Sequence, residues 1–410
     1  MRRINESRVG WNTFFALSLI PLSGFAMDVY IPSLPDMASK LHATPASIQL
    51  TLSIFIISYG ISQFLVGALV DRYGRYLPNL AAMLVFSAAS FAIAFSHSLQ
   101  LIYIMRAVQG LTVAVIVVSK RAYFVDVFKG EQLKKYTSLF SVIWAIAPIV
   151  APFLGGFFQS QWGWWANFMF LGFFGLAFFI VECFIGAESM KEPQAFKLGQ
   201  VVRTYGTMLR TKDFTAGLIV LGLVYAMVLV YGMASPFLIE NKLHLSASIT
   251  GYCSLFSGVS VFMGGSLSRM LIQKPFFKKL VIANSIQLVS VMALLILTGF
   301  HQNLFTLLAF VFLLHSSGGF IFNNLLSYCL IRFPQFAGKS SGLVGGGFSV
   351  VTSIFSSLLV NGIFINNQLW LGVAYGVLSV AVLVLLLSTS WQGEQKKEER
   401  LEYELLGEVA

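Results

Sequence analysis

The sequence predicts an all-α integral membrane protein with twelve transmembrane helices in two six-helix halves. Apolar residues make up 57% of the 410 positions and charged residues only 11%, whereas soluble domains carry roughly 25% charged residues. Apolar segments of about 20 residues, the length that crosses a bilayer, recur along the whole chain. They lack the alternation typical of a membrane β-barrel, so helices are expected.

Short loops separate the expected spans, which cover residues 12–34, 48–68, 78–96, 99–119, 136–156, 163–185, 214–237, 249–271, 278–299, 303–324, 340–361 and 369–390. One longer loop follows the sixth span. We therefore expect four regions, namely an N-terminal half (1–185), a connector (186–213), a C-terminal half (214–390) and a tail (391–410).

The connector contains apolar residues at helical spacing, namely Leu198, Val201, Val202, Tyr205, Met208 and Leu209. Such a stripe is typical of a helix lying on the anionic membrane surface. An ordinary connector helix packed on the protein fits the pattern equally well.

Lysine and arginine residues indicate the orientation. With the N-terminus in the cytoplasm, all 27 except Lys40, Lys242 and Arg106 lie in or beside cytoplasmic segments, as the positive-inside rule requires. Both termini are therefore expected in the cytoplasm, and the first span is expected to be an anchor rather than a cleaved signal peptide. Because the basic residues lie in short membrane loops, the net charge of +10 does not indicate nucleic acid as a partner.

Two charged residues, Asp28 and Arg106, lie inside apolar spans, where a charge costs roughly 2.5–3.5 kcal/mol on insertion scales. At 1.5 Å per residue, Asp28 lies ~9 Å from the outer end of the first span and Arg106 ~10 Å from that of the fourth. Their similar depth predicts that they respond to each other. They are expected to form either a proton-coupling pair or a structural salt bridge.

Residues 67–76, after the second span, read Gly-Ala-Leu-Val-Asp-Arg-Tyr-Gly-Arg-Tyr. Gly67 permits close helix approach and Gly74 supports a tight turn. The charged residues can form a network with helix ends that latches one conformation: Asp71, Arg72 and Arg75. A weaker echo at residues 264–269 has Ser268 in place of the acid, as expected for two related halves.

The fifth span carries two prolines and two glycines within nine residues: Pro148, Pro152, Gly155 and Gly156. Prolines bend a helix and free backbone carbonyls, and small residues allow helices to touch and slide. The alternative is a permanently kinked helix that does not move, which would contain the same residues.

Together these stretches resemble the major facilitator superfamily. Residues 67–75 resemble its GxxxDRxGRR signature, with Tyr76 at the last basic position, and residues 106–110 resemble its RxxQG motif. The fifth span is similar to the antiporter motif of the drug/proton exchangers. Residues 28–35 (Asp-Val-Tyr-Ile-Pro-Ser-Leu-Pro) resemble the DxYLPALP stretch of Bcr/CflA-type drug-resistance transporters.

The resemblance implies the major facilitator fold and a proton-coupled secondary transporter that exports small amphipathic or cationic compounds by alternating access. Asp28 would alternate between a protonated form and an anion that attracts substrate or pairs with Arg106. The proton gradient supplies the energy, without a cofactor. The expected partners are a small-molecule substrate and the lipid bilayer, and the chain is expected to be a monomer in a bacterial-type inner membrane.

Two other functions stay open at this point. The chain could transport a specific metabolite such as a siderophore, inward as well as outward. A non-transporting membrane sensor or scaffold ranks last, since it would not need the Asp28 and Arg106 pair. An enzyme is not expected, because no nucleophile–base arrangement or metal cluster occurs in the sequence.

Candidate substrate-binding residues carry polar or aromatic groups within the spans: Tyr30, Gln109, Tyr225, His315 and Asn323. For His315, a hydrogen-bonded core histidine is favoured over a group that titrates or binds substrate. Glu182, near the cytoplasmic end of the sixth span, is expected to reach water and to have a structural role.

Overall fold

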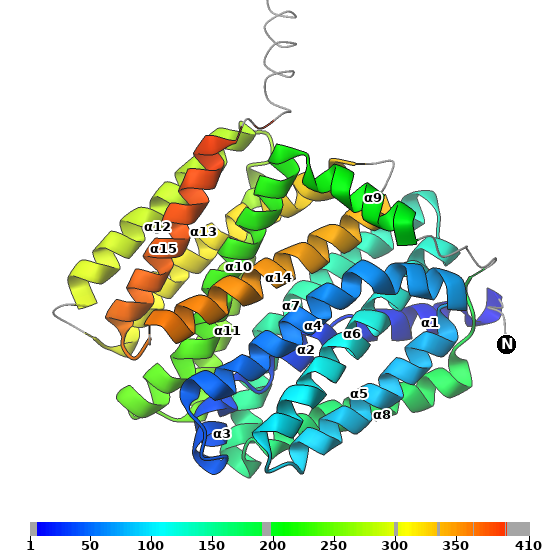
Figure 1. Ribbon diagram of the computed structural model, residues 1–410, viewed down its shortest axis with the longest axis horizontal. Coiled ribbons are helices and arrows are strands. Elements are labelled where there is room, and N and C mark those ends of the chain that lie inside the picture. Colours follow the sequence, from blue (N-terminus) through cyan, green and yellow to red (C-terminus); the bar gives the residue numbers. More distant parts are fainter. Residues whose placement is uncertain are drawn as a thin grey trace, which may run out of the picture.

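The computed structural model describes residues 6–190, 198–298, 302–333, 337–363, 365–389 and 391. All its secondary-structure elements in these ranges are helices, which confirms the predicted fold class. Eleven helical segments of the described residues, the first being Val9–Lys40, are long and apolar enough to cross a membrane. The remaining expected span lies on α7 (Gly130–Trp162), which runs among them (Figure 1).

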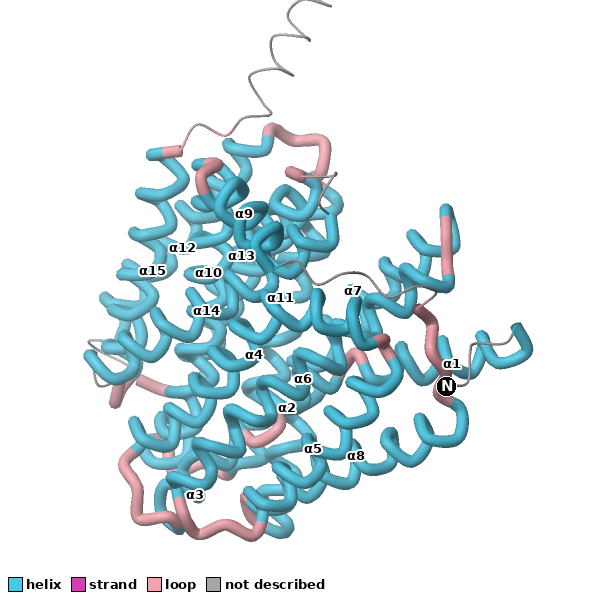
Figure 2. The backbone as a smooth tube through the Cα atoms, turned by 45° about the vertical axis from the view of Figure 1, so that its right-hand side comes forward, coloured by secondary structure: helices cyan, strands magenta, loops and turns pink. Residues whose placement is uncertain are grey.

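The N-terminal helices run from residue 6 to residue 185: α1 (Glu6–Leu19), α2 (Leu22–Asp28), the 3₁₀ helix η1 (Ile31–Ser33), α3 (Leu34–Lys40), α4 (Pro45–Tyr73), α5 (Tyr76–Ala94), α6 (Leu99–Val127), α7 and α8 (Trp165–Ile185). After α9 (Leu198–Leu209) follow α10 (Lys212–Pro236), the π-helix η2 (Phe237–Lys242), α11 (Ala247–Met270), α12 (Phe276–Thr298), α13 (Leu304–Ile331), α14 (Ala337–Ile363) and α15 (Gln368–Ser388). Short loops join most of these helices at their ends (Figure 2).

We call the end of the bundle that carries residues 71–76 and α9 the motif face. The other end, which carries the turns at 41–44 and 243–246, is the opposite face. The two groups of helices meet along two long contacts, α4 with α14 and α7 with α11. Between α4 and α14, Ser353 Oγ donates a 3.0 Å hydrogen bond to the carbonyl oxygen of Ser53. The limits given above for the four regions stay a prediction.

The first expected span is a broken helix rather than a continuous one. α1 ends before Pro21, whose nitrogen has no hydrogen to continue the helical ladder. α2 then ends at Asp28, and Pro32 lies in the first turn of η1. Irregular backbone at membrane depth is tolerated only where protein buries it or where it lines a cavity. Asp28 therefore stands at a break, with free backbone groups nearby.

The connector forms α9 beside α14 at the motif face (Figure 1). Tyr205 packs against the ring of Phe64 and its hydroxyl donates to the Phe64 carbonyl oxygen at 3.4 Å. Met208 is buried, whereas Val202 and Leu209 are exposed. One side of α9 is thus packed on the protein, and apolar side chains remain exposed on the other.

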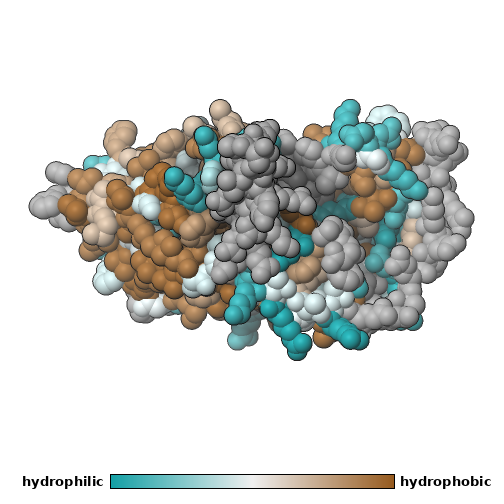
Figure 3. All heavy atoms as spheres, turned by 90° about the horizontal axis from the view of Figure 1, so that it is seen from above, coloured by the Kyte–Doolittle hydropathy of each residue, from teal (hydrophilic) through white to brown (hydrophobic). Residues whose placement is uncertain are grey.

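Large apolar side chains cover the flank formed by α12 and α15, the field of apolar residues in Figure 3. Exposed examples are Ile286, Val289 and Met292 on α12 and Val380 and Val384 on α15. Such a surface is suited to lipid and not to water. It agrees with a multi-pass membrane protein.

Glu182 does not reach water, contrary to the sequence-based expectation. Its side chain is buried within the N-terminal helices, where Lys120 Nζ lies 2.7 Å from its Oε1 atom. Asn79 Nδ2 donates to the same oxygen at 3.2 Å. The three residues join α5, α6 and α8, and these contacts agree with the expected structural role of Glu182.

We expect Lys120→Ala to lower the free energy of unfolding by roughly 3–5 kcal/mol, because it leaves Glu182 buried without a cation. Thermal unfolding of the purified protein in detergent measures this loss. Lys120→Met combined with Glu182→Gln removes both charges and should recover most of it. Equal stability of the single and double variants would contradict this interpretation.

Candidate functional site

A cavity of about 1070 Å³ lies between the two groups of helices. It extends from Asp28 on α2 to Arg75 and Lys339 at the motif face. Toward the opposite face the two groups are in contact, as where Gln49 Nε2 donates to the Met233 carbonyl oxygen at 2.8 Å. The cavity therefore communicates with the motif face.

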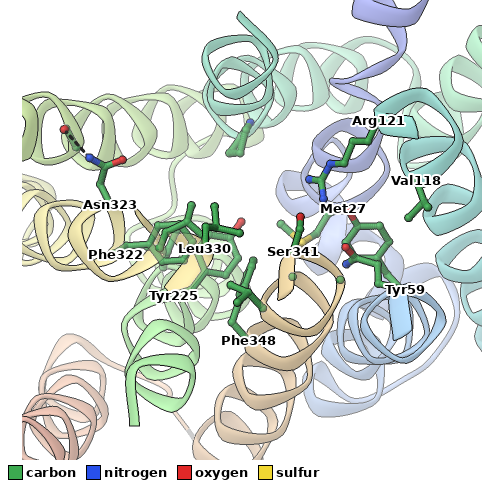
Figure 4. Close-up of a pocket in the computed structure, with 18 of the residues that line it drawn as sticks. Met27, Tyr59, Val118, Arg121, Tyr225, Phe322, Asn323, Leu330, Ser341 and Phe348 are labelled. Carbon is green, nitrogen blue, oxygen red and sulfur yellow. Dashed lines mark hydrogen bonds between the residues drawn. The ribbon is translucent and has the colours of Figure 1, made fainter. Parts of the chain in front are cut away.

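The two sides of the cavity differ in chemistry. Tyr225, Phe322 and Phe348 form one aromatic wall, with ring centroids 5.5–5.8 Å apart. Met27 and Tyr59 lie on the other side (Figure 4). This combination of an apolar aromatic surface with a few polar groups is typical of sites for small organic molecules.

Asp28 contributes a carboxylate to this cavity. Its side chain is 5% exposed, and Oδ2 has no hydrogen-bond partner among the described residues. A buried polar atom without a partner is unusual in native proteins and indicates a functional group or an absent ligand. Asp28 thus keeps one carboxylate oxygen unpartnered among the described residues in this conformation.

Arg106 is fully buried, and neutral groups surround its guanidinium in place of a carboxylate. Its guanidinium lies between the rings of Tyr30 and Phe55, 4.7 and 4.3 Å from their centroids. Nε donates to the Thr51 carbonyl oxygen at 3.3 Å and Nη1 to that of Ala26 at 2.9 Å. Aromatic faces and carbonyl oxygens both attract a guanidinium, so the charge is compensated locally.

The predicted partners Asp28 and Arg106 are therefore neighbours but not an ion pair in the described part of the chain. The two are connected through the backbone, since Arg106 binds the carbonyl two residues before Asp28. A structural salt bridge, the alternative open at the sequence level, is not present in this conformation. Arg106 Nη2 also lacks a partner among the described residues.

The five candidate substrate-binding residues divide into two groups. Tyr225 and Asn323 line the cavity. Tyr30 and Gln109 lie behind its wall and hold Arg106, Gln109 Oε1 accepting from Nη1 at 2.8 Å. His315 is also fully buried behind the wall, with both ring nitrogens hydrogen-bonded.

The latch residues form a network at the motif face. Arg75 Nη2 lies 2.7 Å from Asp71 Oδ1, and Arg75 Nε lies 3.2 Å from Asp126 Oδ2. Gly74 has φ = 94°, a conformation that favours glycine in this turn. Arg72 is exposed and stacks on the ring of Tyr73.

Three residues of this network, Asp126, Glu188 and Ser189, were not predicted. The Glu188 carboxylate accepts the backbone N–H groups of Arg75 and Tyr76 at 3.0–3.1 Å, at the N-terminus of α5. Ser189 Oγ donates to Asp126 Oδ2 at 2.9 Å. An acid directly after an apolar span is a signal for such a role, but its partners lie more than a hundred residues away in sequence.

The antiporter-motif residues connect the break in the first span to the C-terminal helices. Pro148 and Pro152 lie inside α7 and line the cavity. Gly155 packs so closely on the Val29 carbonyl oxygen that any Cβ would overlap it. Its neighbour Gly156 packs on α11, where a Cβ would lie 2.7 Å from the Ala247 carbonyl oxygen.

Gly67 makes no comparable contact, contrary to the close helix approach expected there. A Cβ at Gly67 would meet nothing within 4 Å. The reason is that Gly67 lines the cavity in this conformation.

Comparison with known proteins agrees with this architecture. The model of the Major Facilitator Superfamily matches residues 16–356. Multidrug resistance protein D of Escherichia coli is 24% identical over 83% of this chain and 86% of its own length. The Bicyclomycin resistance protein homolog of Haemophilus influenzae is 25% identical, covering 85% and 88%. These relatives confirm the resemblance to Bcr/CflA-type transporters.

Solved structures show the same fold. The crystal structure of a D-xylose-proton symporter superposes with a TM-score of 0.70. The match covers 92% of this chain and 97% of that chain at 15% sequence identity.

We expect Gly155→Ala to lower the free energy of unfolding by roughly 1–3 kcal/mol, because a methyl group there forces α7 away from the break in the first span. Gly67→Ala is the matched control, since the same methyl group faces open space. Melting temperatures in detergent compare the two variants. A Gly155→Ala protein as stable as Gly67→Ala would contradict the close contact with Val29.

Proposed function

The chain belongs to the Major Facilitator Superfamily and is a multi-pass membrane transporter, and we propose that it exports amphipathic organic cations in exchange for protons. The observation that carries the proposal is the carboxylate of Asp28, which lines the cavity and whose buried oxygen Oδ2 has no partner among the described residues. Relatives named for resistance to several drugs and to bicyclomycin support export as the direction.

The cavity suits a substrate that is both cationic and apolar. Tyr225, Phe322 and Phe348 offer apolar surface and ring faces that attract a cation. Asp28 provides the negative charge on the first span. No other acidic group in the described part of the chain is buried, has an unpartnered oxygen and lines the cavity. Asp28 is therefore the group for which we propose that a proton and a substrate cation compete.

Competition at one carboxylate produces exchange. A proton that binds Asp28 displaces the cation, and a cation that binds displaces the proton. The two are therefore carried across the membrane in opposite directions. Arg106 lies beside Asp28, and its Nη2 has no partner among the described residues. It supplies a positive charge when the Asp28 carboxylate has bound neither a proton nor a cation. The proton gradient is the proposed source of energy, with no cofactor.

The conformation described here is open to one side. We assign the motif face to the cytoplasm, so the cavity takes substrate from inside the cell, with both termini on the same side and the chain in a bacterial inner membrane. The network of Asp71, Arg75 and Asp126 holds α4 to α6 at the mouth of the cavity. Export then requires opening at the opposite face along the α7–α11 and α4–α14 contacts. A monomer contains all the residues that this mechanism uses.

We expect Asp28→Asn to reduce gradient-driven uptake of tetraphenylphosphonium into inside-out vesicles to the level of vesicles without the protein. Asparagine keeps the shape of the side chain but cannot exchange a proton or attract a cation. The measurement is radiolabelled uptake with and without a pH gradient.

Asp36→Asn is the matched control, because Asp36 accepts from Gln159 Nε2 at 3.0 Å and does not line the cavity. This variant should keep gradient-driven uptake. Full uptake by the Asp28→Asn protein would refute the assignment of Asp28.

A further inference from the structure

A second polar cluster lies in the C-terminal half and is centred on His315. Its Nδ1 atom lies 2.7 Å from Ser257 Oγ on α11, and Nε2 lies 3.1 Å from the Tyr375 hydroxyl on α15. Tyr231 packs edge-on against the imidazole, 5.4 Å between ring centroids. Of these residues, Tyr231 and Ser257 line the cavity.

The hydrogens of this cluster can be assigned from its geometry. Tyr375 is 1% exposed and its hydroxyl has His315 as the one partner found in the described residues. A buried hydroxyl hydrogen without an acceptor costs free energy, so Tyr375 donates to Nε2. A neutral imidazole has one donor and one acceptor nitrogen, and therefore Nδ1 carries the hydrogen and donates to Ser257.

Ser257 is thus an acceptor toward His315, and its own hydrogen has no acceptor among the residues that the structure describes. Ser254, one turn earlier on α11, also lines the cavity; it is 7% exposed and its Oγ has no partner among the described residues. Other serines of α11 behave differently. Ser260 and Ser266 donate to carbonyl oxygens of their own helix at 2.8 and 2.9 Å.

From this contrast we infer that Ser254 and Ser257 form a neutral hydrogen-bond donor subsite in the cavity wall. His315 and Tyr375 are positioning residues that turn the Ser257 hydrogen toward the cavity. The subsite binds an acceptor oxygen of the substrate, such as a carbonyl. The inference rests on the proposed function and deepens it, because among organic cations the preferred substrates would carry an acceptor oxygen away from the charged atom.

A donor subsite of this kind discriminates between substrates of equal charge. A ligand without an acceptor leaves these hydroxyl groups unpaired, so it binds more weakly than a ligand of equal charge that carries an acceptor oxygen. The subsite and Asp28 therefore recognise different parts of the same molecule. Asp28 binds the charge, and Ser254 and Ser257 select the polar group.

The test compares two probes of equal charge: tetraphenylphosphonium, and its derivative with one acetyl group on a phenyl ring. Equilibrium binding to the purified full-length protein in detergent gives Kd for each. We expect Ser254→Ala combined with Ser257→Ala to weaken binding of the acetyl probe roughly five- to tenfold, the loss of one or two hydrogen bonds. Binding of tetraphenylphosphonium should stay unchanged.

Ser260→Ala is the matched control on the same helix, since its hydroxyl is buried and bonded to the Phe256 carbonyl oxygen. It should leave the ratio of the Kd for tetraphenylphosphonium to the Kd for the acetyl probe as in the wild type. His315→Leu should lower that ratio as Ser257→Ala does, and His315→Asn should restore it, because its amide N–H replaces the Nδ1 donor. A purely structural role of His315 would instead weaken both probes alike.

The outcomes separate the inference from the proposed function. Suppose that the wild type binds tetraphenylphosphonium and Asp28→Asn abolishes this binding, but the serine variants leave the Kd ratio unchanged. The inference is then wrong and the proposed function stands. Equal losses for both probes in the double serine variant would also overturn it. If the wild type binds neither probe, the proposed function and the inference both fail.

Discussion

The structure depends on how a buried guanidinium is neutralised without a carboxylate. α2 ends at Asp28, so the Ala26 carbonyl lies in the last turn of the helix, where carbonyl groups lack helical partners. Arg106 takes this carbonyl, together with the Thr51 carbonyl and two ring faces. As a result neutral groups hold the arginine, and Asp28 Oδ2 has no partner among the described residues, as the proposed exchange requires. By offering the Ala26 carbonyl to Arg106, the break in the first span thus lets the Asp28 carboxylate stay outside an ion pair.

The same break is held by the helix that carries the antiporter motif. Gly155 of α7 packs directly on the Val29 carbonyl, and the next residue, Gly156, packs on α11 of the other group of helices. Asp28 is thus adjacent in sequence to Val29, whose contact with α7 connects it to the boundary between the two groups of helices. In the proposed cycle this contact couples occupation of Asp28 to movement of α7 against α11. Close packing favours such transmission, because tightly packed interfaces shift between discrete arrangements rather than deform continuously.

Much of this could be predicted from the sequence because hydropathy reports burial in lipid, and the cost of a charge there singled out Asp28 and Arg106. What the sequence could not show depends on contacts between distant residues. Hydropathy averages over a window, so it predicts one continuous span across the break between α1 and α2. The ion pair of Glu182 with Lys120 and the cap formed by Glu188 required the packing of α5 against α8. Tyr30 and Gln109 are candidate substrate-binding residues from the sequence, but their side chains are turned toward Arg106.

The most direct test of the central claim is to count protons when a cation binds. Purified protein in weakly buffered detergent solution, with a pH-sensitive dye, is titrated with tetraphenylphosphonium. If the cation displaces a proton from Asp28, the wild type releases protons in proportion to bound cation, and the Asp28→Asn protein releases none. Equal release by both proteins would show that the exchanged proton belongs to another group and would contradict the account.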